Sequence, residues 1–133
     1  MRLKLRLAAV ALLAPSVAAN AGNIDRQLQM LDPEERAHQV CVIKGVDTMR
    51  KDPKLQGVDR KKVDRIKTSI TGRAKFTGTQ VSTVGGAVRA KDHWYGLKFT
   101  CDVTTDQMKA LTFTYEVGKE IPEAKWDDLG LWR

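Results

Sequence analysis

The stretch around His93 comes closest to an acid–base site. His93 stands between Asp92 and Trp94 in the sequence KDHWYG. A histidine there could act as a general base. The sequence offers it no matched nucleophile, because Ser69 and Ser82 lie in no motif that would raise a hydroxyl on a strand-to-helix turn. We therefore assign no catalytic residue and interpret His93 as a surface or partly packed side chain.

Neither a metal site nor a cofactor site is expected. The two histidines, His38 and His93, are far apart and belong to no HxxxH or HExxH motif. The acidic pairs Glu34–Glu35 and Asp127–Asp128 could suggest glycosidase carboxylates. Helix-end electrostatics explains the first pair, and the second pair lies in an exposed-looking tail.

A basic segment between residues 60 and 75 is the strongest candidate for a binding site. If it is helical, several of its cations share one face, which could hold an anionic lipid, lipopolysaccharide or another acidic glycan. The alternative is a solvated face that only aids solubility. The candidate contacts are Arg60, Lys61, Lys62, Arg65, Lys67, Arg73 and Lys75.

Three tryptophans are candidate aromatic contacts: Trp94, Trp126 and Trp132. The last two belong to the ending IPEAKWDDLGLWR, which predicts a short helical turn after Pro122 and then a tail. Its apolar side chains either cover an open side of the sheet or form a small apolar patch that a partner buries. The sequence leaves both roles open for all three tryptophans.

The first 21 residues are typical of a secretory signal peptide. Three basic residues precede an apolar run at 7–14, and small residues follow up to Ala21. The run is shorter than the roughly 20 residues that a membrane-spanning helix needs. We expect cleavage after Ala21, with Ala19 as the alternative. The sequence thus predicts a signal peptide at 1–21, one domain at 22–133, and a periplasmic or secreted location.

Removing residues 1–21 changes the argument from charge. The whole chain has a net charge of +7, and the signal contains three basic and no acidic residues, so the mature chain carries +4. This modest excess in an exported protein does not indicate nucleic-acid binding. No later stretch is apolar enough to span a membrane. The sequence does not predict an oligomeric state.

Cys41 and Cys101 are the two cysteines. An even number of cysteines in an oxidising compartment predicts a disulfide. Closing so long a loop stabilises a fold by about 4 kcal/mol. A metal-binding or catalytic pair is the competing interpretation, but no CxxC spacing or histidine cluster supports it.

The first half of the mature chain has helical signals. A short helix is expected at 23–30, capped by its first residue. In LDPEERAHQVC, Asp32 is a plausible N-cap and Pro33 suits the first helical position. That helix should end at Asp52, which precedes a proline. A third helical stretch is expected at about 58–69.

The second half alternates apolar and polar residues, as strands do. Short strands are expected at 74–76, 80–84 and 87–91, with a tight turn at Gly85–Gly86 between the last two. Two longer runs joined by 104–109 should pair as an antiparallel hairpin. Their predicted buried residues are Tyr95, Leu97, Phe99, Cys101 and Val103 in one run, and Leu111, Phe113, Tyr115 and Val117 in the other.

These elements predict an α+β fold, with N-terminal helices packed on a C-terminal antiparallel sheet of about four strands. Cys101 shares the buried face of the hairpin, so we place the helix that carries Cys41 over that face. Helix-on-sheet packing then brings the two sulfur atoms together, and the expected fold has one disulfide.

Four motifs resemble a known family of small exported proteins. They are LDPEERAHQVC, VDRIKTS, GGAVRAKDHWYGLKFTC and WDDLGLW, in this order, and they span residues 31–132. The chain resembles the family called domain of unknown function 930, found largely in alphaproteobacteria. The resemblance implies a periplasmic protein of a Gram-negative cell, and it carries no activity and no catalytic residue.

The function expected from the sequence is a non-catalytic binding or structural module of the cell envelope. Its basic face would meet an anionic lipid, lipopolysaccharide, a glycan or an envelope protein. One alternative is a small hydrolase of envelope material that uses His93 and nearby acids. The other alternative is a protein inhibitor of an envelope or host enzyme, although positive charge suits a basic target such as lysozyme poorly.

Overall fold

A computed structural model describes residues 17–133 of the chain. The predicted signal peptide lies mostly outside these residues. In chain order the elements are α1 (Val17–Met30), α2 (Pro33–Lys51), the 3₁₀ turn η1 (Arg60–Lys62), β1 (Val63–Lys67), β2 (Lys75–Phe76), β3 (Gln80–Ala90), β4 (His93–Val103), β5 (Ala110–Glu120), the 3₁₀ turn η2 (Glu123–Lys125) and α3 (Trp126–Leu129).

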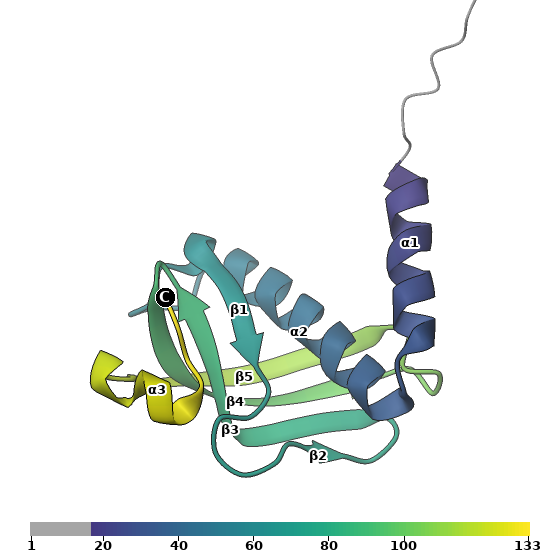
Figure 1. Cartoon of the computed structure of the whole chain (residues 1–133). Helices are drawn as coiled ribbons and strands as arrows, with labels where there is room; N and C mark the ends of the chain where they lie inside the picture. Colours follow the sequence, from purple (N-terminus) through teal and green to yellow (C-terminus); the bar gives the residue numbers. More distant parts are fainter. Residues whose placement is uncertain (1–16) are drawn as a thin grey trace, which may run out of the picture.

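The strands form one antiparallel sheet in the order β1-β3-β4-β5, and β2 pairs with β3 on the same edge as β1. Figure 1 shows α2 lying across one face of this curved sheet, while α3 lies outside its bend. The α+β class, with helices packed on an antiparallel sheet, is confirmed. No helix among the described residues is long and apolar enough to cross a membrane.

Helix α2 begins and ends where its local sequence indicates. The side chain of Asp32 accepts a hydrogen bond from the backbone N–H of Glu35 at 2.9 Å, and Pro33 is the first helical residue. Asp52 is the C-cap, directly before a proline. The buried face of the helix consists of Ala37, Val40, Cys41, Gly45 and Met49.

The predicted disulfide between Cys41 and Cys101 is confirmed. The bridge joins α2 to β4 with a Cα–Cα distance of 6.0 Å. Neither cysteine is exposed to solvent, and both belong to the main core between α2 and the sheet. The bridge therefore links the helical layer covalently to the sheet.

Helix α1 is longer than predicted and stands away from the sheet (Figure 1). It continues back to Val17, so Asn23 lies inside the helix and does not cap it. Only its final turn packs on the domain, through buried Leu28. Arg36 holds this junction together, because its guanidinium donates to the carbonyl oxygens of Leu28, Leu31 and Asp106.

The helix predicted at 58–69 is wrong. One short 3₁₀ turn is followed by strand β1, which pairs with residues 87–90 of β3. A register shift lies between Val63 and Arg65, so one extra residue is inserted there. This places Val63 and Ile66, three residues apart, on the same buried face. The bulge therefore produces a spacing that resembles a helix.

The hairpin turn predicted at Gly85–Gly86 is also wrong. Residues 80–90 form the single strand β3, with a register shift between Thr83 and Gly86. The chain turns instead at Lys91 and Asp92, which have φ angles of 49° and 62°. Two consecutive residues with positive φ give a tight turn that fits the twist of the strands.

The hairpin of β4 and β5 has the predicted pairing, with Phe99 opposite Tyr115 and Cys101 opposite Phe113. Phe99 and Phe113 stack at 4.9 Å between ring centres. Leu111 was expected on the buried face but is 58% exposed. A register shift between Asp102 and Val103 changes the pairing at this end of the hairpin.

Candidate functional site

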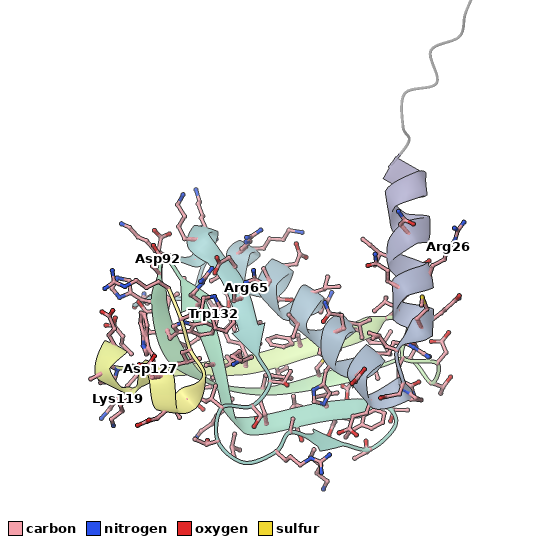
Figure 2. The ribbon with its side chains drawn as sticks, in the orientation of Figure 1. Arg26, Arg65, Asp92, Lys119, Asp127 and Trp132 are labelled. Carbon is pink, nitrogen blue, oxygen red and sulfur yellow. A yellow bond between two sulfur atoms is a disulfide. The ribbon has the colours of Figure 1, made fainter. Side chains whose placement is uncertain are left out.

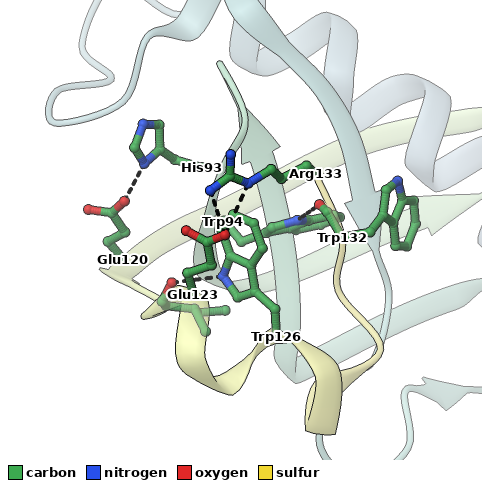
Figure 3. Close-up of polar contacts among 8 residues, drawn as sticks. His93, Trp94, Glu120, Glu123, Trp126, Trp132 and Arg133 are labelled. Carbon is green, nitrogen blue, oxygen red and sulfur yellow. Dashed lines mark hydrogen bonds and ion pairs between the residues drawn. The ribbon is translucent and has the colours of Figure 1, made fainter.

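The face of the sheet opposite α2 is only partly covered. After β5 the chain folds back through η2 and α3, and a second small core forms there from Trp94, Ala87, Trp126 and Leu131. The indole N–H of Trp126 donates to the carbonyl oxygen of Ile121 at 3.0 Å. Figure 3 shows this C-terminal segment lying over the ring of Trp94. Beyond it, the middle of the sheet stays open.

The structure separates the three candidate tryptophans. Trp94 is fully buried and Trp126 is 7% exposed, so both are core residues and cannot contact a ligand in this conformation. Trp132 is 44% exposed, and its ring lies 5.2 Å from the ammonium nitrogen of Lys67. Among these tryptophans, only Trp132 retains the surface that a contact role requires.

The basic segment does not form one face. Arg60 donates to the carbonyl oxygen of Arg50 at one end of α2, and Lys61 and Lys62 are exposed on η1. Lys67 donates to the carbonyl oxygen of Gly130 at 2.8 Å.

The remaining three cations lie at two different places. Arg65 lies on β1 near Trp132 (Figure 2). Arg73 and Lys75 are exposed beside β3, before and on β2. The segment thus contributes cations to three separate parts of the surface.

Arg73 and Lys75 meet a third cation on the open face. They line a shallow hollow of about 500 Å³ together with Lys98 of β4. Glu116 is the only carboxylate in its lining. Within residues 22–133, no ion pair or side-chain hydrogen bond engages these three cations. We call this the cationic hollow.

A second hollow of about 600 Å³ adjoins the first, between the sheet and the C-terminal segment. Its floor is formed by four glycines, Gly85, Gly86, Gly96 and Gly118, and we call it the glycine hollow. Its apolar wall consists of Ile70, Val84, Ile121, Pro122 and Leu129. Lys98, Glu116 and Val84 line both hollows, so the two adjoin along these residues.

Two of these glycines are required by packing. A Cβ on Gly85 would collide with the backbone oxygen of Thr71, and one on Gly86 would lie 2.9 Å from the carbonyl oxygen of Lys67. The carbonyl oxygen of Gly85 also accepts from the N–H of Ile70 at 2.7 Å. Because the 70–71 loop and the end of β1 approach β3 this closely, no side chain fits at these positions.

Gly96 and Gly118 are different. A Cβ on Gly96 would come no closer than 3.9 Å to another atom, and one on Gly118 no closer than 3.5 Å. Neither residue has a left-handed φ angle. Both lie inside strands, where glycine is unfavourable. Their missing side chains keep the floor of the hollow open without being needed for the fold.

His93 has a carboxylate partner. Its Nδ1 lies 2.5 Å from Oε1 of Glu120, and both side chains are about half exposed. Figure 3 shows this pair beside the ion pair of Glu123 and Arg133. They line a hollow of about 490 Å³ whose lining contains no serine, threonine or cysteine. The pair can hold a histidine ring in place, but no side-chain nucleophile lies with it.

The carboxyl groups with lowered pKa values are engaged in structural contacts. The guanidinium of Arg89 donates two hydrogen bonds to Asp64 and holds the pKa of that carboxyl below its ordinary value of 3.8. Hydrogen bonds from Gln80 and Thr112 lower the pKa of Asp102. Neither carboxyl group lines one of the hollows. Among the described residues, no group of three or more His, Cys, Asp or Glu could hold a metal ion.

The glycine hollow is the feature that the sequence analysis missed. The sequence predicted a turn at Gly85 and Gly86, and no role was predicted for Gly96 or Gly118. One signal was available: Gly96 lies inside one strongly alternating run and Gly118 at the end of another, and each falls on the polar face. Glycine inside a strand often marks a bulge or the close approach of a ligand or another backbone.

The fold defines a small disulfide-linked α+β domain with a partly open sheet face. The family model of Domain of Unknown Function (DUF930) matches residues 28–131. The chain belongs to this family. No curated protein and no solved structure matches it.

Proposed function

We propose that this protein is an exported, non-catalytic module of the cell envelope that binds an anionic ligand on the open face of its sheet. One observation carries the proposal. Arg73 before β2, Lys75 on β2 and Lys98 on β4 line one hollow, in which Glu116 is the only opposing charge. Their charges are available to an anion.

Of the cations in the basic segment, the proposal keeps only Arg73 and Lys75 as ligand contacts. It adds Lys98 to them. Lys67 is held by the carbonyl oxygen of Gly130 and the ring of Trp132, and Arg60 is held by the carbonyl oxygen of Arg50. Those contacts are structural. Lys61 and Lys62 are exposed at the far end of the segment, on η1, and they do not line the cationic hollow.

Export is proposed from two features. Residues 1–21 have the pattern of a signal peptide, and a fully buried disulfide joins the two layers of the domain. Disulfides form and persist in oxidising compartments such as the periplasm. Fractionation of cells that carry a tagged full chain tests this: the mature protein, beginning at Gly22, should be found outside the cytoplasm.

Cosedimentation with vesicles tests the binding surface. Vesicles of phosphatidylcholine alone are compared with vesicles that also contain phosphatidylglycerol, and lipopolysaccharide is the second probe. The protein should bind the anionic surfaces only, and binding should weaken as salt is raised. The test variant changes Arg73, Lys75 and Lys98 to glutamine. The matched control changes Lys54, Lys61 and Lys62 to glutamine, which removes the same charge from exposed positions elsewhere.

The test variant should lose most of its binding, while the control should keep most of it. Equal losses in both variants would show that net charge, and not this hollow, attracts the ligand. Binding that does not change with salt would also contradict the proposal.

A hydrolase is the second candidate, because His93 and Glu120 form a close histidine–carboxylate pair. In that case the histidine would have to activate a water molecule directly. Peptidoglycan and phospholipid substrates are incubated with the wild type and with His93→Ala. Turnover that is lost only in the variant would favour the enzyme over the binding module.

A further inference from the structure

Gly96 and Gly118 lie opposite each other on the open face of β4 and β5, and their missing side chains shape the glycine hollow. In most strand positions a β-branched residue packs better than glycine and costs less conformational entropy. Neither the φ angles nor the neighbours of these two residues require glycine. What an added Cβ would enter is the open space of the hollow.

The hollow is apolar and of the size that small molecules occupy. Its volume of about 600 Å³ falls within the roughly 300–1,000 Å³ of typical ligand pockets. Apolar side chains from β3, the 70–71 loop, the link between β5 and η2, and α3 surround the backbone floor. Val84 is 83% exposed where the two hollows join, an unusual position for a valine in a long strand. A ligand chain that covers Val84 would remove this apolar surface from water.

Three cations lie at one end of the glycine hollow. Where the glycine hollow opens beside Val84, it meets the cationic hollow with Arg73, Lys75 and Lys98. At its other end the rim has mixed charges from Lys119, Lys125 and Glu120, and Figure 2 shows Lys119 beside α3. The glycine hollow, with three cations at one end, is complementary to a molecule with an apolar chain and an anionic head.

We infer that the glycine hollow binds the hydrocarbon chain of a single-chain anionic amphiphile, whose acidic head lies against Arg73, Lys75 and Lys98. The inference rests on the proposed function, since it places the anionic ligand at the same cations. It goes further by naming a monomeric ligand and by assigning Gly96 and Gly118 as the residues that admit its chain. An extended membrane surface could contact the three cations without inserting a hydrocarbon chain into the glycine hollow.

Titration calorimetry with dodecyl phosphate, kept below the concentration at which it forms micelles, tests the inference. Inorganic phosphate supplies the head without the chain, and dodecyl maltoside supplies the chain with a neutral head. The wild type should bind dodecyl phosphate more tightly than either control compound. Gly96→Val and Gly118→Val, which fill the glycine hollow, should each weaken dodecyl phosphate binding by roughly tenfold or more.

The matched control is Thr112→Val. It places the same side chain on the same strand and face as Gly118→Val, but outside both hollows. Its affinity should equal that of the wild type. Gly96→Ala and Gly118→Ala add one methyl group at ordinary contact distances. These variants should keep the fold even if valine disturbs the strand, and they should lose less affinity for dodecyl phosphate than the valine variants. Thermal unfolding of every variant tests whether the fold is kept.

The outcomes separate the two proposals. If the glycine variants bind dodecyl phosphate as the wild type does, or if the wild type does not bind it, the chain does not lie in the hollow and the inference is wrong. If the variant with glutamine at 73, 75 and 98 binds it as tightly as the wild type, the cationic hollow is not the anion site and the proposed function is wrong. If the glycine variants and the glutamine variant all lose dodecyl phosphate binding, while Thr112→Val binds it as the wild type does, both the inference and the proposed function are supported.

Discussion

Trp94 donates its indole N–H to the backbone carbonyl oxygen of Trp132 at 2.7 Å, although 38 residues separate them in the chain. The two rings also meet edge to face, with centres 5.5 Å apart. Since Trp94 has no exposed surface, this bond satisfies a buried donor that would otherwise lack a partner. The last residues therefore pack against the second core, and residues 121–129 of the same segment line the glycine hollow.

Removing the anchor of that segment should destabilise the whole domain. Trp126 is 7% exposed and packs with Trp94 in the second core. We expect Trp126→Ala to lower the free energy of unfolding by about 3 kcal/mol, because a large buried ring leaves a cavity. Chemical denaturation followed by circular dichroism measures this change.

Trp132→Ala is the comparison. Its side chain is 44% exposed, and the bond to Trp94 uses the backbone oxygen, which alanine retains. The expected loss is about 1 kcal/mol or less. A larger loss from Trp132→Ala than from Trp126→Ala would contradict the assignment of Trp126 as the anchor.

The disulfide should contribute a large share of the stability. Cys41 and Cys101 enclose 60 residues, and closing a loop of that length removes about 4 kcal/mol of chain entropy from the unfolded state. The variant with alanine at both positions should therefore unfold at much lower denaturant concentration than the oxidised wild type. Both cysteines are fully buried, so dithiothreitol should reduce the bridge quickly only when denaturant is present. Fast reduction of the native protein would show that the bridge is accessible.

Local signals predicted the helix and the central hairpin correctly. Asp32, Pro33 and the proline after Asp52 act within a few residues, so the bounds of α2 follow from the sequence. The position of Cys101 on the apolar face of an alternating run was enough to place α2 over that face. Such features depend on one element and its neighbours.

The errors arose where residues distant in the sequence decide the local structure. Val63 and Ile66 have a helical spacing because a bulge in β1 inserts one residue, and the need for that bulge comes from pairing with β3. Gly85 is a glycine because Thr71 passes over it, and Gly86 because the backbone oxygens of Lys67 and Leu97 lie against it. The real turn uses Lys91 and Asp92, which no glycine marks.

The candidate site was predictable in part. The proposal of an anionic ligand, and two of its proposed contacts, Arg73 and Lys75, follow from the excess of cations in the basic segment. Lys98 could not be added, because it comes from another strand and only the register of β4 against β3 places it nearby. The glycine hollow depends on the C-terminal segment folding back over the sheet, and no local pattern shows where that segment lies.

Acid should weaken a contact between α2 and β5. The hydroxyl of Tyr115 donates to Oδ2 of Asp52 at 2.5 Å, and this hydrogen bond is the main reason that the pKa of Asp52 lies below its ordinary value of 3.8. A carboxyl group whose pKa is lowered by folding stabilises the fold above its unfolded pKa. That contribution is lost as the pH falls through the lower, folded pKa. The affected pH range is therefore below 3.8.

Tyr115→Phe tests this linkage. Without the hydroxyl, the pKa of Asp52 should move up toward its ordinary value, and stability should fall less steeply as the pH drops below 3.8. Carbon-detected NMR titration of the Asp52 carboxyl group measures the first change, and denaturation at several pH values measures the second. Tyr95→Phe is the control, because no hydrogen bond of the Tyr95 hydroxyl to Asp52 is present. An unchanged pKa of Asp52 in Tyr115→Phe would contradict the assignment.

Gly45 in the middle of α2 should resist substitution by alanine, although alanine favours a helix by about 1 kcal/mol over glycine. A Cβ on Gly45 would lie 2.6 Å from Cζ of Phe113 and 2.7 Å from Cδ1 of Ile66. Overpacking of this kind costs about 1–3 kcal/mol. We therefore expect Gly45→Ala to lower the free energy of unfolding by about 1 kcal/mol or more, despite the better helix former.

Phe113→Leu removes the ring that the new methyl group would meet. In that background Gly45→Ala should cost less than in the wild type, or even stabilise the domain, with a coupling of about 1 kcal/mol between the two changes. Denaturant unfolding of the two single variants and the double variant measures the coupling. Additive effects would mean that α2 shifts to accommodate the methyl group, so that the tight approach of α2 to β5 does not explain the glycine.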